Sequence, residues 1–188
     1  MSAHSSRLDS DSVHLLQLMA DYNAWMNQQI YHSASELSAE QRDQDRGAFF
    51  GSITGTLNHL VVGDIIWLKR FAGYPPFAER LFALDNYAAP KSLDQIWHHD
   101  FASLRQTRVH LDQVITHWAQ SLRAEDLAQA FRYTNSKGVT SQRRLGHLIL
   151  HFFNHQTHHR GQVTTLLQQA GQDVGMTDLL AKIPLIHP

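Results

Sequence analysis

Histidines are concentrated in one stretch of this chain. Five of the fourteen lie between Leu145 and Leu167, in the segment LGHLILHFFNHQTHHRGQVTTLL. The segment lacks proline and its apolar residues recur at helical spacing, which predicts one long amphipathic helix. On the inward face of that helix, His155 and His159 stand where leucines would be expected. Four residues make about one helical turn, so both imidazoles would project from the same face. Because imidazole is a common ligand of divalent metals, the pair indicates a metal site.

Ordinary core histidines are the competing interpretation, because a histidine on an apolar face is more often hydrogen-bonded in the core than bound to a metal. However, two buried neutral imidazoles need partners for four ring nitrogens, and a metal would meet half of that need. His147 and His151 continue the series, but positions eight residues apart rise about 12 Å along the helix, too far to share one ion. His158 lies beside the inward face and is a weaker partner for His155. A further ligand must come from another helix.

Composition limits both the chemistry and the partners. The 188 residues fit one domain, expected over residues 1–188 with residues 1–10 flexible. A formal net charge of −1 without runs of like charge argues against a nucleic-acid partner. The absence of cysteine excludes disulfides, thiolate metal sites and a protein thiol nucleophile. The polar amino terminus and the lack of a long apolar run predict no signal peptide and no membrane contact, and hence a cytoplasmic protein.

Apolar residues at helical spacing predict four amphipathic helices. Ser10 or Asp11 is expected to cap the first helix, and Ser92 with Gln95 forms a capping-box pattern at the start of the third. The expected ranges are 13–37, 48–72, 92–122 and 145–171.

The segments between these helices differ in character. Residues 73–91 contain three prolines and form a long connection, which permits a crossover along a bundle. Residues 123–140 include a turn at 135–138 and predict a small hairpin. Thr177 is expected to cap one short C-terminal helix that ends at Pro184. The expected fold is therefore all-α: a four-helix bundle with a long crossover connection and a short C-terminal helix.

The second predicted helix offers His59 as the further ligand, because metal sites in helical bundles are built from side chains on facing helices. The small residues Ser52, Thr56 and Gly63 lie around His59 and leave room for a close helix approach or a cavity. By spacing alone, an ordinary histidine at the edge of the apolar face is equally expected. The paired Glu-x-x-His motifs of di-iron bundles and the HExxH metalloprotease motif are absent from the sequence. A site made of histidines therefore remains.

Charged residues interrupt the apolar faces of two helices, at Asp64 and Arg108. Asp64 could orient a metal-binding imidazole or form an ion pair with Arg108, Arg144 or Arg160. Arg108 could pair with Asp64, face a pocket, or extend its guanidinium to solvent from the edge of the face. Arg160 could attract an anionic substrate or simply be solvated. The sequence leaves these alternatives open.

The chain resembles the DinB (damage-inducible) family, within the wider DinB/YfiT-like metal-binding superfamily. Two motifs carry the resemblance: NHLVVGDIIWLKRF at residues 58–71 and HFFNHQTHHRGQ at residues 151–162. TDLL at residues 177–180 and YNAWMN at residues 22–27 are weaker marks. The motifs occur in family order and span nearly the whole chain.

The resemblance implies a four-helix bundle that holds one divalent metal ion on three histidines. The family's ligand on the second helix falls on His59, and its His-x-x-x-His motif falls on His155 and His159. His151 and His158 belong to the motif but are not family ligands. The superfamily's metals include nickel, zinc and iron, so the resemblance does not identify the metal.

Three neutral histidines leave a coordination position open, as catalytic metal sites do. The superfamily includes thiol S-transferases that use low-molecular-weight thiols such as bacillithiol or mycothiol. The resemblance therefore implies a metal-dependent thiol S-transferase or hydrolase acting on a small molecule, with its catalytic residues unidentified, in a homodimer. The alternative is a non-enzymatic metal-binding protein of the stress or damage response. An ion sealed under Trp25, Trp67 and Phe152 would argue against an enzyme.

Overall fold

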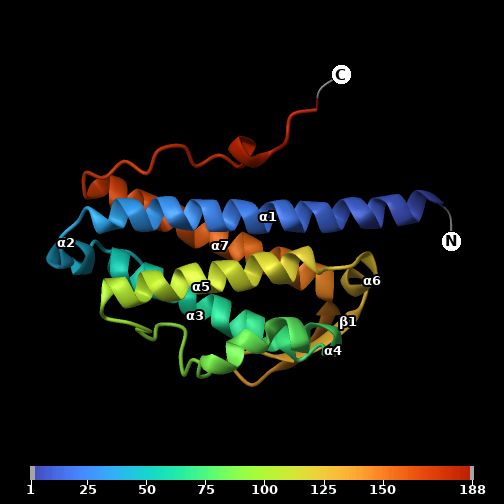
Figure 1. Ribbon diagram of the computed structural model, residues 1–188. Helices are drawn as coiled ribbons and strands as arrows, with labels where there is room; N and C mark the ends of the chain where they lie inside the picture. The colour runs from blue at the N-terminus through green and yellow to red at the C-terminus, as the bar shows by residue number, and fades with distance from the viewer. Residues whose placement is uncertain (1–2, 187–188) are drawn as a thin grey trace.

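Four long helices form most of the protein. The computed structural model describes residues 3–186, and the side chains from residue 11 onward. Within that range, the four long helices are α1 (Ala3–Ser35), α3 (Ile53–Ala72), α5 (Phe101–Gln120) and α7 (Leu145–Gln169). Helix α1 packs against α5 and α7, and α3 packs against α7 and α5, so the helices lie side by side around one core (Figure 1). The prediction of an all-α fold is confirmed.

Three of the four long helices begin at residues other than those predicted, and α1 and α3 are two of them. Helix α1 already starts at Ala3, so Ser10 and Asp11 lie inside it and the predicted N-cap is wrong. Whether residues 1–10 are flexible stays a prediction, since residues 1–2 lie outside the described range. Helix α3 starts at Ile53 instead of residue 48, because Ser52 is its N-cap and accepts a hydrogen bond from the backbone N–H of Gly55 at 3.0 Å.

Helix α5 begins nine residues later than predicted. Its N-cap is Asp100, whose carboxylate accepts a hydrogen bond from the backbone N–H of Ser103 at 2.8 Å. The predicted capping box is wrong, because the side chain of Gln95 accepts from the backbone of Lys91 instead. Residues 92–100 are not helical; the amide oxygen of Asn58 accepts hydrogen bonds from the backbone N–H groups of residues 97 and 98 at 2.7 and 2.9 Å. This contact ties the segment to α3.

Short elements connect the long helices. The long connection after α3 contains two short helices, and the segment before α3 contains one. The predicted hairpin is present as an antiparallel pair in which Phe131 lies opposite Arg143. The predicted short C-terminal helix is a single 3-10 turn. The bounds are α2 (Ala39–Asp43), α4 (Pro75–Ala78), η1 (Glu79–Asn86), α6 (Ala124–Leu127), β1 (Ala130–Thr134), β2 (Thr140–Arg144) and η2 (Leu179–Lys182).

Candidate metal centre

Three histidines from two helices converge on one point. His59 projects from α3, and His155 and His159 project from α7 one turn apart. The Nε2 atom of His59 lies 3.3 Å from Nε2 of His155 and 3.1 Å from Nε2 of His159. Each side chain offers one ring nitrogen, and these three atoms all lie within 4.8 Å of one another. The structure thus brings together the three histidines singled out from the sequence, called the histidine trio below.

The outward nitrogens of two members fix the tautomer of their rings. Nδ1 of His59 lies 2.8 Å from the carbonyl oxygen of Leu93, and Nδ1 of His159 lies 2.7 Å from the amide oxygen of Gln162. These oxygens can only accept, so each Nδ1 carries the proton and donates it. In a neutral ring the Nε2 atom then bears a lone pair. Two lone pairs therefore face each other across 3.1 Å, an arrangement that a cation between them would stabilise.

Burial keeps the trio in the neutral form that binds metals. His59 is only 4% exposed, whereas His155 and His159 are partly exposed. Burial lowers the pKa of all three imidazoles. For His155, repulsion from the neighbouring histidines adds to burial and lowers the pKa to about 3. The lone pairs are consequently available at neutral pH without competition from protons.

The spacing of the nitrogens fits a divalent metal ion. Zinc–imidazole bonds of about 2.0–2.1 Å in tetrahedral geometry place two ligand nitrogens roughly 3.3 Å apart. The distances of 3.1 and 3.3 Å from Nε2 of His59 agree with that value. The trio could therefore hold a metal ion without a large rearrangement of the chain.

The surroundings of the trio include two features that shape it. Gly63 faces the ring of His155, and a Cβ atom at this position would lie 2.9 Å from Cε1 of that ring. Phe50, from the turn before α3, stacks on His59 with ring centroids 3.8 Å apart and meets His159 edge-on at 5.6 Å. Helical spacing in the sequence indicates Gly63 as a neighbour of the site. It does not indicate Phe50, because Phe50 precedes the helix.

A seal of three aromatic rings over the ion would argue against an enzyme, but these rings contact other residues. Trp25 contacts Tyr22, and Phe152 lies against Trp118 and other core rings. Trp67 packs against His151 of α7, with ring centroids 5.1 Å apart. The aromatic cover of the trio comes instead from Phe50. Since His155 and His159 keep part of their surface exposed, the trio is not closed off from solvent.

The other histidines of the motif lie outside the trio. The ring centroid of His151 is 6.2 Å from that of His155. His158 meets the ring of His159 at 4.8 Å, and its Nε2 atom lies 3.3 Å from the side-chain nitrogen of Gln162. Neither contributes a nitrogen to the point where the trio converges. The ligand set implied by the resemblance stays a prediction.

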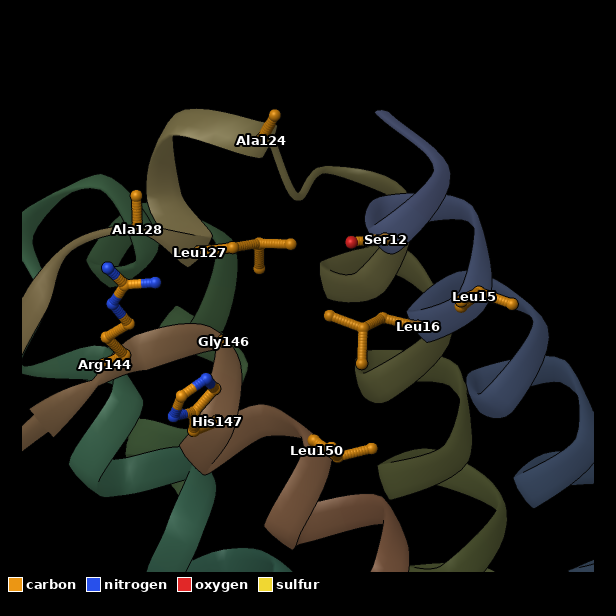
Figure 2. Close-up of a pocket in the computed structure, with 10 residues that line it drawn as sticks. All are labelled: Ser12, Leu15, Leu16, Ala124, Leu127, Ala128, Arg144, Gly146, His147 and Leu150. Atoms are coloured by element: carbon orange, nitrogen blue, oxygen red, sulfur yellow. The ribbon is translucent and has the colours of Figure 1, made fainter. Parts of the chain in front are cut away.

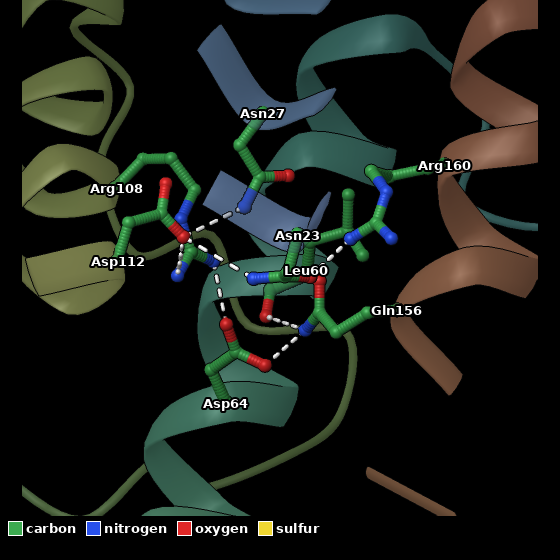
Figure 3. A network of polar contacts seen from close by, with 8 residues as sticks. All are labelled: Asn23, Asn27, Leu60, Asp64, Arg108, Asp112, Gln156 and Arg160. Atoms are coloured by element: carbon green, nitrogen blue, oxygen red, sulfur yellow. Dashed lines mark hydrogen bonds and ion pairs between the residues drawn. The ribbon is translucent and has the colours of Figure 1, made fainter. Parts of the chain in front are cut away.

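The alternatives for Asp64 and Arg108 are resolved in favour of an ion pair. Nη1 of Arg108 lies 2.6 Å from Oδ2 of Asp64, and both side chains are 1% exposed (Figure 3). Arg108 also pairs with Asp112 one turn along α5, at 2.9 Å. Burial raises the pKa of Asp64 to about 6, and the Arg108 guanidinium opposes that shift. Among the described residues, no imidazole forms a hydrogen bond with Asp64; its Oδ1 atom accepts a hydrogen bond from the side chain of Gln156.

Arg160 belongs to the same buried polar layer. It is 2% exposed, so it is not solvated, and it donates to the side-chain oxygen of Asn23 on α1 (Figure 3). Its guanidinium also lies 5.3 Å from the ring centroid of Tyr22. Asn23 and Asn27 both donate to Asp112, at 3.3 and 2.8 Å. This layer therefore joins all four long helices through hydrogen bonds and ion pairs, next to the trio but separate from it.

A hollow of about 310 Å³ lies at the other end of α7 (Figure 2). The side chains of Leu16 from α1 and Leu127 from α6 point toward each other across it, and Leu150 of α7 lies on its edge. None of the trio lines this hollow. The chemistry of the trio is therefore independent of it.

The fold and the site define an all-α protein with a three-histidine group able to hold a metal ion. Comparison with known families agrees: residues 7–185 match the model of the DinB family, so the chain belongs to that family. It is 28% identical over 158 residues to "Protein DinB" of Bacillus subtilis (strain 168), which covers 84% of this chain and 87% of that protein. No solved structure gives a significant match. Across the described residues, no helix combines the length and apolar character needed to cross a bilayer.

Proposed function

We propose that this DinB-family protein binds one divalent metal ion through Nε2 of His59, His155 and His159, and that it is a metal-dependent enzyme of the thiol S-transferase type. The observation that carries the metal site is the convergence of three ring nitrogens, two of which must bear lone pairs because their Nδ1 atoms donate to oxygens. Nickel, zinc and iron all accept imidazole ligands, so the donor set alone selects none of them.

A divalent ion held by three histidines supplies a Lewis acid that lowers the pKa of a coordinated thiol or water. The chain's own residues hold and orient the three rings: Leu93 fixes His59, and Gln162 fixes His159. Partial exposure of His155 and His159 leaves a side for a small molecule to approach, and Phe50 covers His59. Since the chain contains no cysteine, the sulfur nucleophile would come from a low-molecular-weight thiol cosubstrate.

Turnover with a thiol tests the enzymatic part. Metal-loaded protein is incubated with a panel of low-molecular-weight thiols and a chromogenic electrophile. We expect metal-dependent turnover with at least one thiol, and none with His155→Ala, because that variant lacks one of the three ring nitrogens. Stoichiometric metal without turnover for any thiol would refute the transferase. Hydrolysis of an ester substrate in the same assay would point instead to activated water.

A non-enzymatic metal-binding role in the stress or damage response is the second candidate. It is favoured by the position of the trio, which joins α3 to α7, so that a bound ion would stabilise the packing of these two helices. Under this alternative, metal raises the unfolding temperature but no thiol gives turnover. A cytoplasmic location and a homodimer stay predictions.

A further inference from the structure

A basic pocket lies on the outer side of α3, between that helix, the segment around residues 89–93 and the hairpin. Its volume is about 400 Å³. Among the residues that the structure describes, three cationic side chains and two hydroxyl groups line it, and no acidic residue does. We propose that this pocket binds the phosphate or carboxylate group of a small molecule. The polar lining consists of Lys69, Arg70, Lys91, Ser92 and Ser136.

Among the lining residues, Arg70 gives the strongest support for anion binding. Its partly buried guanidinium lies 4.8 Å from the ring centroid of Trp67 and 5.7 Å from that of Tyr133. The described residues provide it with no ion pair and no hydrogen-bond acceptor. None of its nitrogens is among the buried atoms that lack a partner, so its donors remain accessible to water and to an anion that enters the pocket. The planar fork of guanidinium donors matches carboxylate and phosphate oxygens.

The lysines add donors to the same pocket. Nζ of Lys69 donates one hydrogen bond to the carbonyl oxygen of Leu84 at 2.9 Å, which holds the ammonium group in place. Its other two N–H groups have no acceptor among the residues that the structure describes. Lys91 is exposed and lies in the segment that forms the opposite wall. An anion in the pocket would thus meet positive charge from both α3 and the segment before α5.

The pocket also adjoins the histidine trio. Leu93 lines the pocket, and its carbonyl oxygen accepts the hydrogen bond from Nδ1 of His59. Ile66, another lining residue, is two turns along α3 from His59, a rise of about 10 Å. A molecule anchored here by its anionic end and reaching the trio would be elongated by about that length. Identifying this molecule as a substrate or cosubstrate rests on the proposed function; anion binding by the pocket does not.

Anion binding is tested on metal-free protein, so that its outcome is independent of the metal site. Inorganic phosphate and succinate are titrated separately into isotope-labelled protein, and backbone amide shifts are followed by NMR. We expect saturable shifts at residues 66–70, 89 and 91–93 for at least one probe, and the two arms distinguish phosphate from carboxylate. Losing a charge-assisted hydrogen bond in Arg70→Gln should weaken binding roughly tenfold or more.

Two further variants separate loss of anion binding from loss of folding and from a general loss of charge. Lys91→Gln alters an exposed side chain, so it should weaken binding without affecting folding, even if Arg70→Gln disturbs the packing on Trp67. Arg105→Gln removes the same charge from an exposed position on α5 and should leave binding unchanged. Absence of saturable shifts with both probes, or equal weakening by Arg105→Gln and Lys91→Gln, would overturn the proposal. Saturable anion binding by a protein that takes up no metal would refute the proposed function and leave this inference standing.

Discussion

Replacing Gly63 by alanine should lower the affinity for metal without lowering the stability of the metal-free protein. The new Cβ atom would lie 2.9 Å from Cε1 and 3.5 Å from Nδ1 of His155. Carbon atoms in ordinary van der Waals contact are about 3.5–4.0 Å apart, so the ring must retreat by roughly 0.6 Å or more. The atom in the way is the far end of a side chain, so the ring can move while the helices stay in place.

The displacement is large on the scale of metal coordination. Metal–ligand distances in genuine sites lie within about 0.2 Å of their ideal values, so a shift of this size weakens or removes one ligand. Disturbing the groups that orient ligands typically costs 10–100-fold in metal affinity, and we expect a loss of that order for Gly63→Ala. Within a helix, alanine is more favourable than glycine by about 1 kcal/mol, so the metal-free variant should unfold no more easily than the parent.

Competition with a chromophoric chelator measures the affinity for zinc, and urea unfolding measures the stability of the metal-free proteins. Gly161→Ala is the matched control, because it makes the same change in α7 two residues from His159, and its Cβ would meet nothing within 4 Å. The control should keep the parent affinity. Equal affinities for Gly63→Ala and the parent protein would refute the placement of His155 at the metal.

Three further predictions follow from the site and its neighbours. The pKa of His155 is lowered from 6.5 to about 3 in the folded state, so its contribution to stability is present above pH 6.5 and is lost as the pH falls. The metal-free protein should therefore lose roughly 2 kcal/mol of its free energy of unfolding between pH 6.5 and 5 through this residue. Urea unfolding of His155→Asn should show a weaker dependence of stability on pH. Gln162→Leu removes the acceptor of His159 Nδ1 and should weaken zinc binding roughly 10–100-fold in the chelator assay, whereas unchanged affinity would show that Gln162 does not orient the ring. Asp64→Ala leaves the buried Arg108 without one of its two carboxylates and should cost roughly 3–5 kcal/mol in urea unfolding; a loss below about 1 kcal/mol would mean that Asp112 alone satisfies the charge.

The features that could be predicted from the sequence are mostly local. The helical spacing of α7 placed His155 and His159 on one face, and the turn residues 135–138 indicated the hairpin. Gly171, with φ +82°, lies just beyond the end of α7, where the sequence placed the stop. Each of these depends on residues within one or two turns of one another, so the pattern contained the necessary information. The pairing of His59 with them required the family resemblance.

The features that could not be predicted depend on contacts between distant segments. Helix α5 starts late because Asn58, forty residues earlier, holds the backbone at residues 97 and 98. The partner of His59 Nδ1 is a main-chain carbonyl at Leu93, and any residue type supplies a carbonyl. Phe50 reaches the trio from a turn that contains Gly51 with φ +73°, and no periodicity describes such a turn. The sequence offered several arginines as partners of Asp64, and only the structure identifies Arg108 as the correct one.

Metal content of the purified protein tests the central claim most directly. The parent and its variants are prepared without a nickel column, and bound metals are measured by elemental analysis. We expect about one divalent ion per chain in the parent and in His151→Ala, whose ring lies outside the trio. His59→Ala, His155→Ala and His159→Ala should each lose stoichiometric metal. Equal metal content in all five proteins, or none in the parent after incubation with nickel, zinc or iron, would contradict the account.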